Sequence, residues 1–131
     1  MKVIRLVIRV LGSALIILGV FFWTGNALAL VPVHMLFGIL LVLLLWTLAV
    51  LAARTGEPPG LVAFAIAWGM IVPILGLTQD QLLPGALHWI IKVLHLLLGL
   101  GAIGVAEMLT RRGLARTQEQ RLTASLAAHG G

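Results

Sequence analysis

Long hydrophobic runs, separated by short polar breaks, dominate the chain. The runs cover roughly residues 3–23, 32–53, 61–77 and 86–110. Each run is close in length to the about 20 apolar residues that a helix needs to cross the roughly 30 Å hydrocarbon core of a bilayer. The breaks are rich in glycine, proline and asparagine, which favour turns. The pattern predicts an all-α fold: an integral membrane four-helix bundle with up-down-up-down topology.

Composition supports this prediction. The chain is 61% hydrophobic and 10% charged, whereas about 25% of the residues of a soluble domain are charged. Cysteine is absent, which excludes disulfides, thiolate metal sites and thiol nucleophiles. We expect residues 1–112 to form the transmembrane bundle. We expect residues 113–131, which are polar and rich in alanine, to form a cytoplasmic tail that extends the fourth helix and then frays.

The basic residues indicate the direction of the helices. Lys92 alone lies well inside an apolar run, and the other eight basic residues are Lys2, Arg5, Arg9, Arg54, Arg111, Arg112, Arg116 and Arg121. These eight fall on one side of the predicted bundle, and the loops on the other side have none. The positive-inside rule therefore places both termini in the cytoplasm of a bacterium, with the chain in the inner membrane. Charge gathered at a membrane face is not the basic stripe of a nucleic-acid binder, so we expect no nucleic-acid partner.

A secretory signal is the competing interpretation of the first 29 residues. The basic start, the apolar stretch and Ala27-Leu28-Ala29 resemble the three parts of such a signal. The apolar stretch from Val10 to Trp23 is at the long end for a signal, and we therefore expect the segment to stay as the first span. Cleavage would leave three spans and an N-terminus outside.

Polar residues inside the spans are the candidates for function, because polar groups are costly in lipid. His34 lies near the outer end of the second run, and His88 and His95 lie in the outer half of the fourth. His88, Lys92 and His95 are spaced i, i+4 and i+7, which places them on one helical face. The second and fourth helices of such a bundle face each other diagonally, so His34 should face this group. Glu107 is expected to form a surface ion pair with the arginine four residues later.

Two of the histidines share a local pattern. Residues 34–38 and 95–99 both have the form H-x-L-x-G, so Gly38 and Gly99 each lie one turn deeper on the histidine's own face. A glycine there leaves space for the edge of a flat ligand. The glycines could equally be helix-packing positions, which we expect for Gly101 and Gly104. The two helix pairs form a weak internal repeat.

A four-helix membrane bundle with histidines facing across it, each followed by glycine at i+4, resembles the membrane b-type cytochromes. The resemblance covers the architecture of the chain and rests on few residues. It implies haem b with two axial histidines. The glycine pattern favours His34 and His95 as ligands of the haem iron, with His88 as the alternative ligand. Lys92 and His88 would then lie near the haem propionates, where a cation neutralises a carboxylate.

The leading hypothesis for the function is electron transfer through one haem near the outer face. We identify no catalytic residues and do not expect the chain to be an enzyme by itself; it would be an electron carrier or a subunit of a redox complex. Besides the lipid bilayer, its partner would be a quinone or a periplasmic redox protein, and the glycine-rich spans would suit a homodimer. Two alternatives stay open: a small transporter or proton path lined by the histidines, and a structural subunit without redox chemistry.

Overall fold

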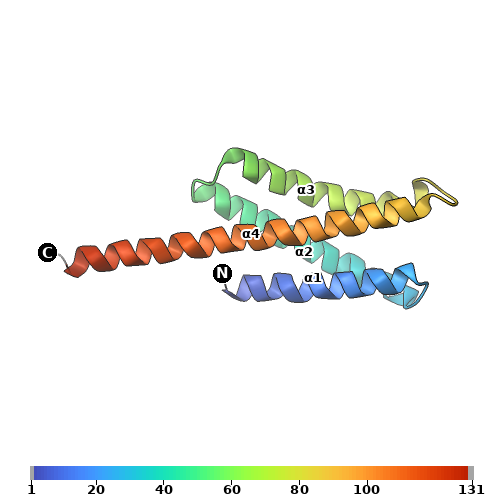
Figure 1. Cartoon of the computed structure of the whole chain (residues 1–131), viewed down its shortest axis with the longest axis horizontal. Helices are drawn as coiled ribbons and strands as arrows, with labels where there is room; N and C mark the ends of the chain where they lie inside the picture. The colour runs from blue at the N-terminus through green and yellow to red at the C-terminus, as the bar shows by residue number, and fades with distance from the viewer. Residues whose placement is uncertain (1, 130–131) are drawn as a thin grey trace.

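The computed structural model describes residues 2–129, which form an all-helical fold without strands. The long helices are α1 (Lys2–Trp23), α2 (Val31–Arg54), α3 (Pro59–Thr78) and α4 (His88–His129), joined in part by the 3-10 turns η1 (Leu28–Leu30) and η2 (Gln79–Gln81) (Figure 1). Each of these four helices is long and apolar enough to cross a membrane, as predicted. The fourth helix continues through the predicted tail as far as His129; the last two residues of that tail lie outside the described range.

The helices pack with α2 and α4 in the middle. Both helices contact α1 and α3, and they also contact each other. Between α1 and α3 the structure has no contact within residues 2–129. Figure 1 shows α4 crossing α2, with α1 and α3 on opposite sides of the pair. The second and fourth helices therefore meet directly, which brings their facing side chains within contact distance.

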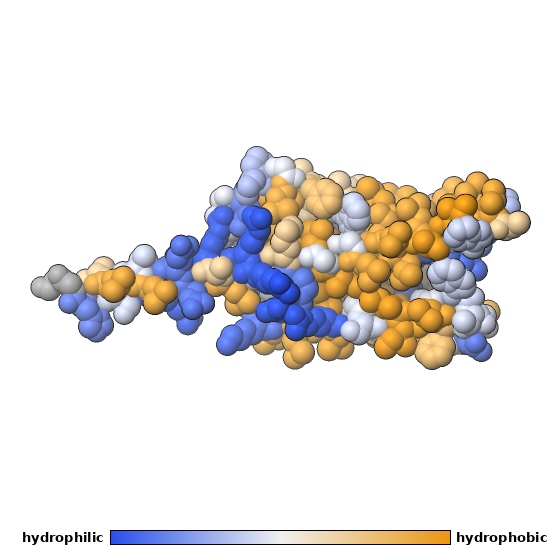
Figure 2. Space-filling model, viewed as in Figure 1, coloured by the Kyte–Doolittle hydropathy of each residue, from blue (hydrophilic) through white to orange (hydrophobic). Residues whose placement is uncertain are grey.

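The bundle has two chemically different ends. The histidine end holds the α1–α2 and α3–α4 connections, residues 24–30 and 79–87. The arginine end holds the start of α1, the α2–α3 turn and the middle of α4. Figure 2 shows polar residues gathered in a band at the arginine end and along the projecting part of α4, whereas the rest of this face is largely hydrophobic. At the α2–α3 turn, Gly56 has φ +77°, a left-handed conformation that glycine adopts without strain and that commonly ends helices.

The buried core lies in the half of the bundle nearer the arginine end. Its members are Ile8, Leu41, Leu45, Leu48, Ala49, Ala52, Ala65, Ala102, Val105, Ala106 and Leu109. Toward the histidine end, residues 13–40 and 70–87 include no fully buried position, and α4 has only Ile91 there before Ala102. Packing is therefore dense on one side of the bundle and loose on the other.

Ion pairs tie the helices together at the arginine end. Glu107 of α4 accepts from Arg5 Nε at 3.0 Å and from Arg9 Nε at 2.5 Å, whereas its predicted partner Arg111 lies farther away at 3.6 Å. The carboxylate thus joins α4 to α1 rather than forming only a pair within one helix. In the α2–α3 turn, the Glu57 side chain is 4% exposed and pairs with two arginines of α4, Arg112 (2.9 Å) and Arg116 (3.0 Å).

Two tryptophans pack against glycines of the next helix. Trp46 of α2 donates to the Ile66 carbonyl at 3.2 Å and lies over Gly69, where an added Cβ would be 2.5 Å from its indole nitrogen. Trp68 of α3 donates to the Leu98 carbonyl at 3.0 Å and lies over Gly101 in the same way. The predicted packing role of Gly101 is confirmed. The same prediction is wrong for Gly104 within the chain, because a Cβ there would meet no atom of another helix of residues 2–129 within 4 Å.

Candidate functional site

His34 and His95 lie side by side in the middle of the bundle. Their ring centroids are 6.4 Å apart and the ring planes are inclined by 53°. The Nδ1 atoms of both rings are buried and have no hydrogen-bond partner within residues 2–129. A buried polar atom without a partner costs about 1–3 kcal/mol. Two such atoms in neighbouring side chains form a polar position inside an apolar bundle for which residues 2–129 supply no partner.

Each of these rings packs against a glycine of an outer helix. A Cβ added to Gly19 of α1 would lie 3.9 Å from Cε1 of His34, and one added to Gly76 of α3 would lie 2.9 Å from Cε1 of His95. Phe22 of α1 adds an edge-on aromatic contact to His34, with centroids 5.4 Å apart. The two histidines therefore lie in matching settings, each between its own helix and the helix before it.

Gly19 and Gly76 were not identified from the sequence. The available signal was their order: each helix pair carries a glycine near the end of its first helix and then an H-x-L-x-G segment, 15 and 19 residues farther on. This correspondence extends the internal repeat, since both halves of the chain supply one glycine and one histidine to the site. Spacing along the sequence does not show which neighbouring helix a glycine faces. The contacts of Gly19 with His34 and of Gly76 with His95 are therefore visible only in the structure.

Gly38 and Gly99, the glycines of the H-x-L-x-G segments, have free space beside them. Both are partly buried, and a Cβ added to either would meet nothing within 4 Å. Among residues 2–129, no side chain of another helix lies within 4 Å of either added Cβ. Whether a ligand uses the space at these two positions stays a prediction.

His88 and Lys92 do not join the His34–His95 pair. His88 Nδ1–H donates to the Leu82 carbonyl at 3.2 Å, and its Nε2 lies 3.9 Å from the Asp80 carboxylate. This ring therefore holds the α3–α4 connection to the start of α4. Lys92 is partly buried, and the described part of the chain gives it no hydrogen bond or ion pair. Of His88 and His95, the two candidate ligands on α4, His95 is the one that lies beside His34.

The paired imidazole rings suit a metal held in a macrocycle better than they suit a bare metal ion. Within residues 2–129 no group of three or more histidine, aspartate or glutamate side chains could hold a metal ion, so a bare ion would have too few protein ligands. Metal–imidazole bonds are about 2 Å long, and two such bonds plus roughly 1 Å from each ring centre to its nitrogen span about 6 Å. The observed 6.4 Å between the ring centroids is close to this length, and it also falls within the range of about 4.5–7 Å for aromatic rings in direct contact. Two imidazoles therefore suit a metal whose remaining positions are filled by its own macrocycle.

No protein family, curated protein or solved structure matches the chain. The function is therefore inferred from the residues of the site.

Proposed function

We propose that this protein is a b-type cytochrome of the bacterial cytoplasmic membrane, carrying electrons through one haem b held by His34 and His95. The observation that carries the proposal is the pair of facing imidazoles, 6.4 Å apart, whose buried Nδ1 atoms have no partner within residues 2–129. In a purely structural pair of histidines, we would expect at least one ring to bond the other or a backbone carbonyl.

The proposed orientation puts both termini in the cytoplasm. It is supported by the eight basic residues at the arginine end and by the connections at the histidine end, residues 24–30 and 79–87, which contain no lysine or arginine. The site would then lie in the outer leaflet. An electron partner would reach it from the membrane as a quinone or from the periplasm as a redox protein.

The side chains of the chain would have distinct roles. Haem b would supply a one-electron couple between ferric and ferrous iron. His34 and His95 would hold the haem, and the chain would act as an electron carrier or as a subunit of a redox complex. The surrounding apolar helices would limit the access of water to the haem and so influence its reduction potential. Lys92, one turn nearer the histidine end than His95, would neutralise a propionate.

A transporter or proton path is the other function that the histidines suggested. The core argues against it, because a cluster of leucine, alanine and valine side chains fills the bundle between the histidines and the arginine end. A polar route would have to pass through these buried apolar residues.

The test is the absorption spectrum of the full chain purified in detergent from cells with ample haem. We expect about one haem per chain and a low-spin spectrum that sharpens on reduction. His95→Ala and His34→Ala should abolish this spectrum. His88→Ala is the matched control on the same helix and should keep it, because His88 is bonded to the α3–α4 connection. A colourless, folded wild-type protein would refute the proposal and leave a structural subunit as the better explanation.

A further inference from the structure

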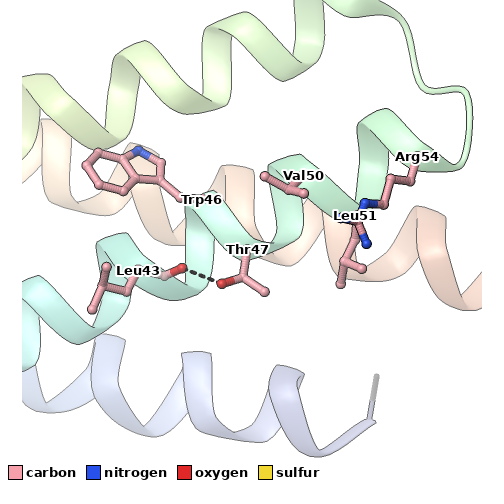
Figure 3. A pocket seen from close by; sticks show the side chains of 6 residues that line it. All are labelled: Leu43, Trp46, Thr47, Val50, Leu51 and Arg54. Carbon is pink, nitrogen blue, oxygen red and sulfur yellow. Dashed lines mark hydrogen bonds between the residues drawn. The ribbon is translucent and has the colours of Figure 1, made fainter.

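A shallow groove runs along α2 on the face opposite α4. Its floor is formed by Leu43, Trp46, Thr47, Val50, Leu51 and Arg54, called here the α2 groove. Figure 3 shows this floor between α1 on one side and α3 on the other, which are not in contact with each other within residues 2–129. The Thr47 hydroxyl donates to the Leu43 carbonyl at 2.8 Å and so adds little polarity. The groove is apolar except at its end.

Arg54 closes the α2 groove at the arginine end. A second, more polar hollow begins at the same residue and continues past Thr55 and Gly56 to Arg116 and Thr117 of α4. Arg54 therefore belongs to both. Arg116 is already paired with Glu57, whereas Arg54 forms no ion pair or side-chain hydrogen bond within the described residues. The junction of the two hollows thus offers an uncompensated guanidinium.

The dimensions match those of one membrane lipid. From Leu43 to Arg54 the helix rises about 16 Å at 1.5 Å per residue, and half of the hydrocarbon core of a bilayer is about 15 Å thick. An acyl chain in the α2 groove would therefore bring its headgroup to the level of Arg54. Guanidinium groups bind phosphate oxygens in a bidentate manner, which places a phosphate at the correct end.

We infer that the α2 groove and Arg54 bind one anionic phospholipid of the leaflet at the arginine end. Glu119 also lines the polar hollow, and its negative charge would repel a phosphate, which favours Arg54 as the partner of the anionic group. The inference does not depend on haem, because the groove lies on the face of α2 turned away from α4 and the histidine pair.

The first test compares lipids on the purified full chain by native mass spectrometry and thermal unfolding. Dioleoyl phosphatidylglycerol should remain bound as one molecule per chain and raise the unfolding temperature more than dioleoyl phosphatidylcholine does. Inorganic phosphate and glycerol phosphate should give no such rise. Equal effects of the two lipids would overturn the inference, as would stabilisation by free phosphate alone. A lipid-free dimer that is lost on Val50→Trp would also overturn it, since a second copy would then cover the groove.

The second test separates the two parts of the site. Arg54→Gln should weaken phosphatidylglycerol binding about fivefold, and Arg54→Lys should retain part of it. The matched control is Arg121→Gln, which removes the same charge from an exposed position on α4. Val50→Trp, which fills the groove, should weaken binding while Arg54 is intact; Ile74→Trp, on an exposed position of α3, should not. If a variant and its control lost the same amount of phosphatidylglycerol binding while helicity stayed unchanged, the proposed lipid site would be contradicted.

Discussion

Replacing Gly76 by alanine tests how closely His95 is held. The added Cβ would lie 2.9 Å from Cε1 of His95 and 3.6 Å from each ring nitrogen. Ordinary van der Waals contact begins near 3.4 Å, so the ring or α3 must move by about 0.5 Å. Overpacking of this kind costs about 1–3 kcal/mol. The higher helix propensity of alanine offsets about 0.5–1 kcal/mol of this loss in the free energy of unfolding.

Gly19→Ala is the matched control, because it makes the same change beside the other histidine. Its Cβ would lie 3.9 Å from Cε1 of His34, which is an ordinary contact. This variant should gain the propensity term without the overpacking term. The two variants should therefore differ by about 1–3 kcal/mol in the free energy of unfolding, with Gly76→Ala the less stable.

The assay is reversible unfolding in mixed micelles, followed by circular dichroism, with both variants measured in parallel. If the protein is loaded with haem, the spectrum supplies a second readout: Gly76→Ala should broaden or weaken the low-spin bands and Gly19→Ala should not. Equal stability of the two variants would show that Gly76 does not pack against His95 as described, whatever the cofactor.

Other substitutions probe the contacts at the arginine end and between α3 and α4. Glu57→Gln leaves Arg112 and Arg116 without their carboxylate partner. Because both arginines are partly exposed, we expect the free energy of unfolding to fall by about 1–3 kcal/mol. The control Glu119→Gln, at an exposed position, should change it by almost nothing. Trp68→Phe removes the bond to the Leu98 carbonyl and should cost about 1 kcal/mol in the same denaturation assay; no loss would mean that water replaces the bond. Glu107→Gln should loosen α1, measured as faster hydrogen exchange in α1 but not in α3; uniform change in both helices would argue against the ion pairs as the link.

The sequence was enough to predict the helices and their order. Apolar runs of about 20 residues have few alternatives to a spanning helix. The predicted bounds of the first three spans therefore differ from the observed ones by at most two residues, and α4 begins two residues later than predicted and continues through the predicted tail to His129. The facing of His34 and His95 also followed from the sequence, because alternate helices of an up-down bundle are parallel and place their outer ends together.

Contacts that depend on the rotation of a helix about its axis were not predictable. Glu107 meets Arg5 and Arg9, which are 102 and 98 residues away, because α4 turns its acidic side chain toward α1. The sequence offered only its near neighbour Arg111. For the same reason Gly104 was taken for a packing position, although the face it occupies meets no other helix of residues 2–129. Glycine spacing along one helix carries no information on what lies opposite.

The uneven packing of the bundle bears on how a cofactor could be inserted. Most of the buried side chains lie nearer the arginine end, where the ion pairs of Glu57 and Glu107 also join the helices. The histidine end has fewer buried contacts, so we expect the helices to separate there at a lower cost in free energy than at the arginine end. A planar ligand dissolved in the bilayer could slip sideways between α2 and α4 after the helices have been inserted, without unfolding of the chain. On this view the ligand would act as the last packing element of the fold, rigidifying an end that the protein leaves loose.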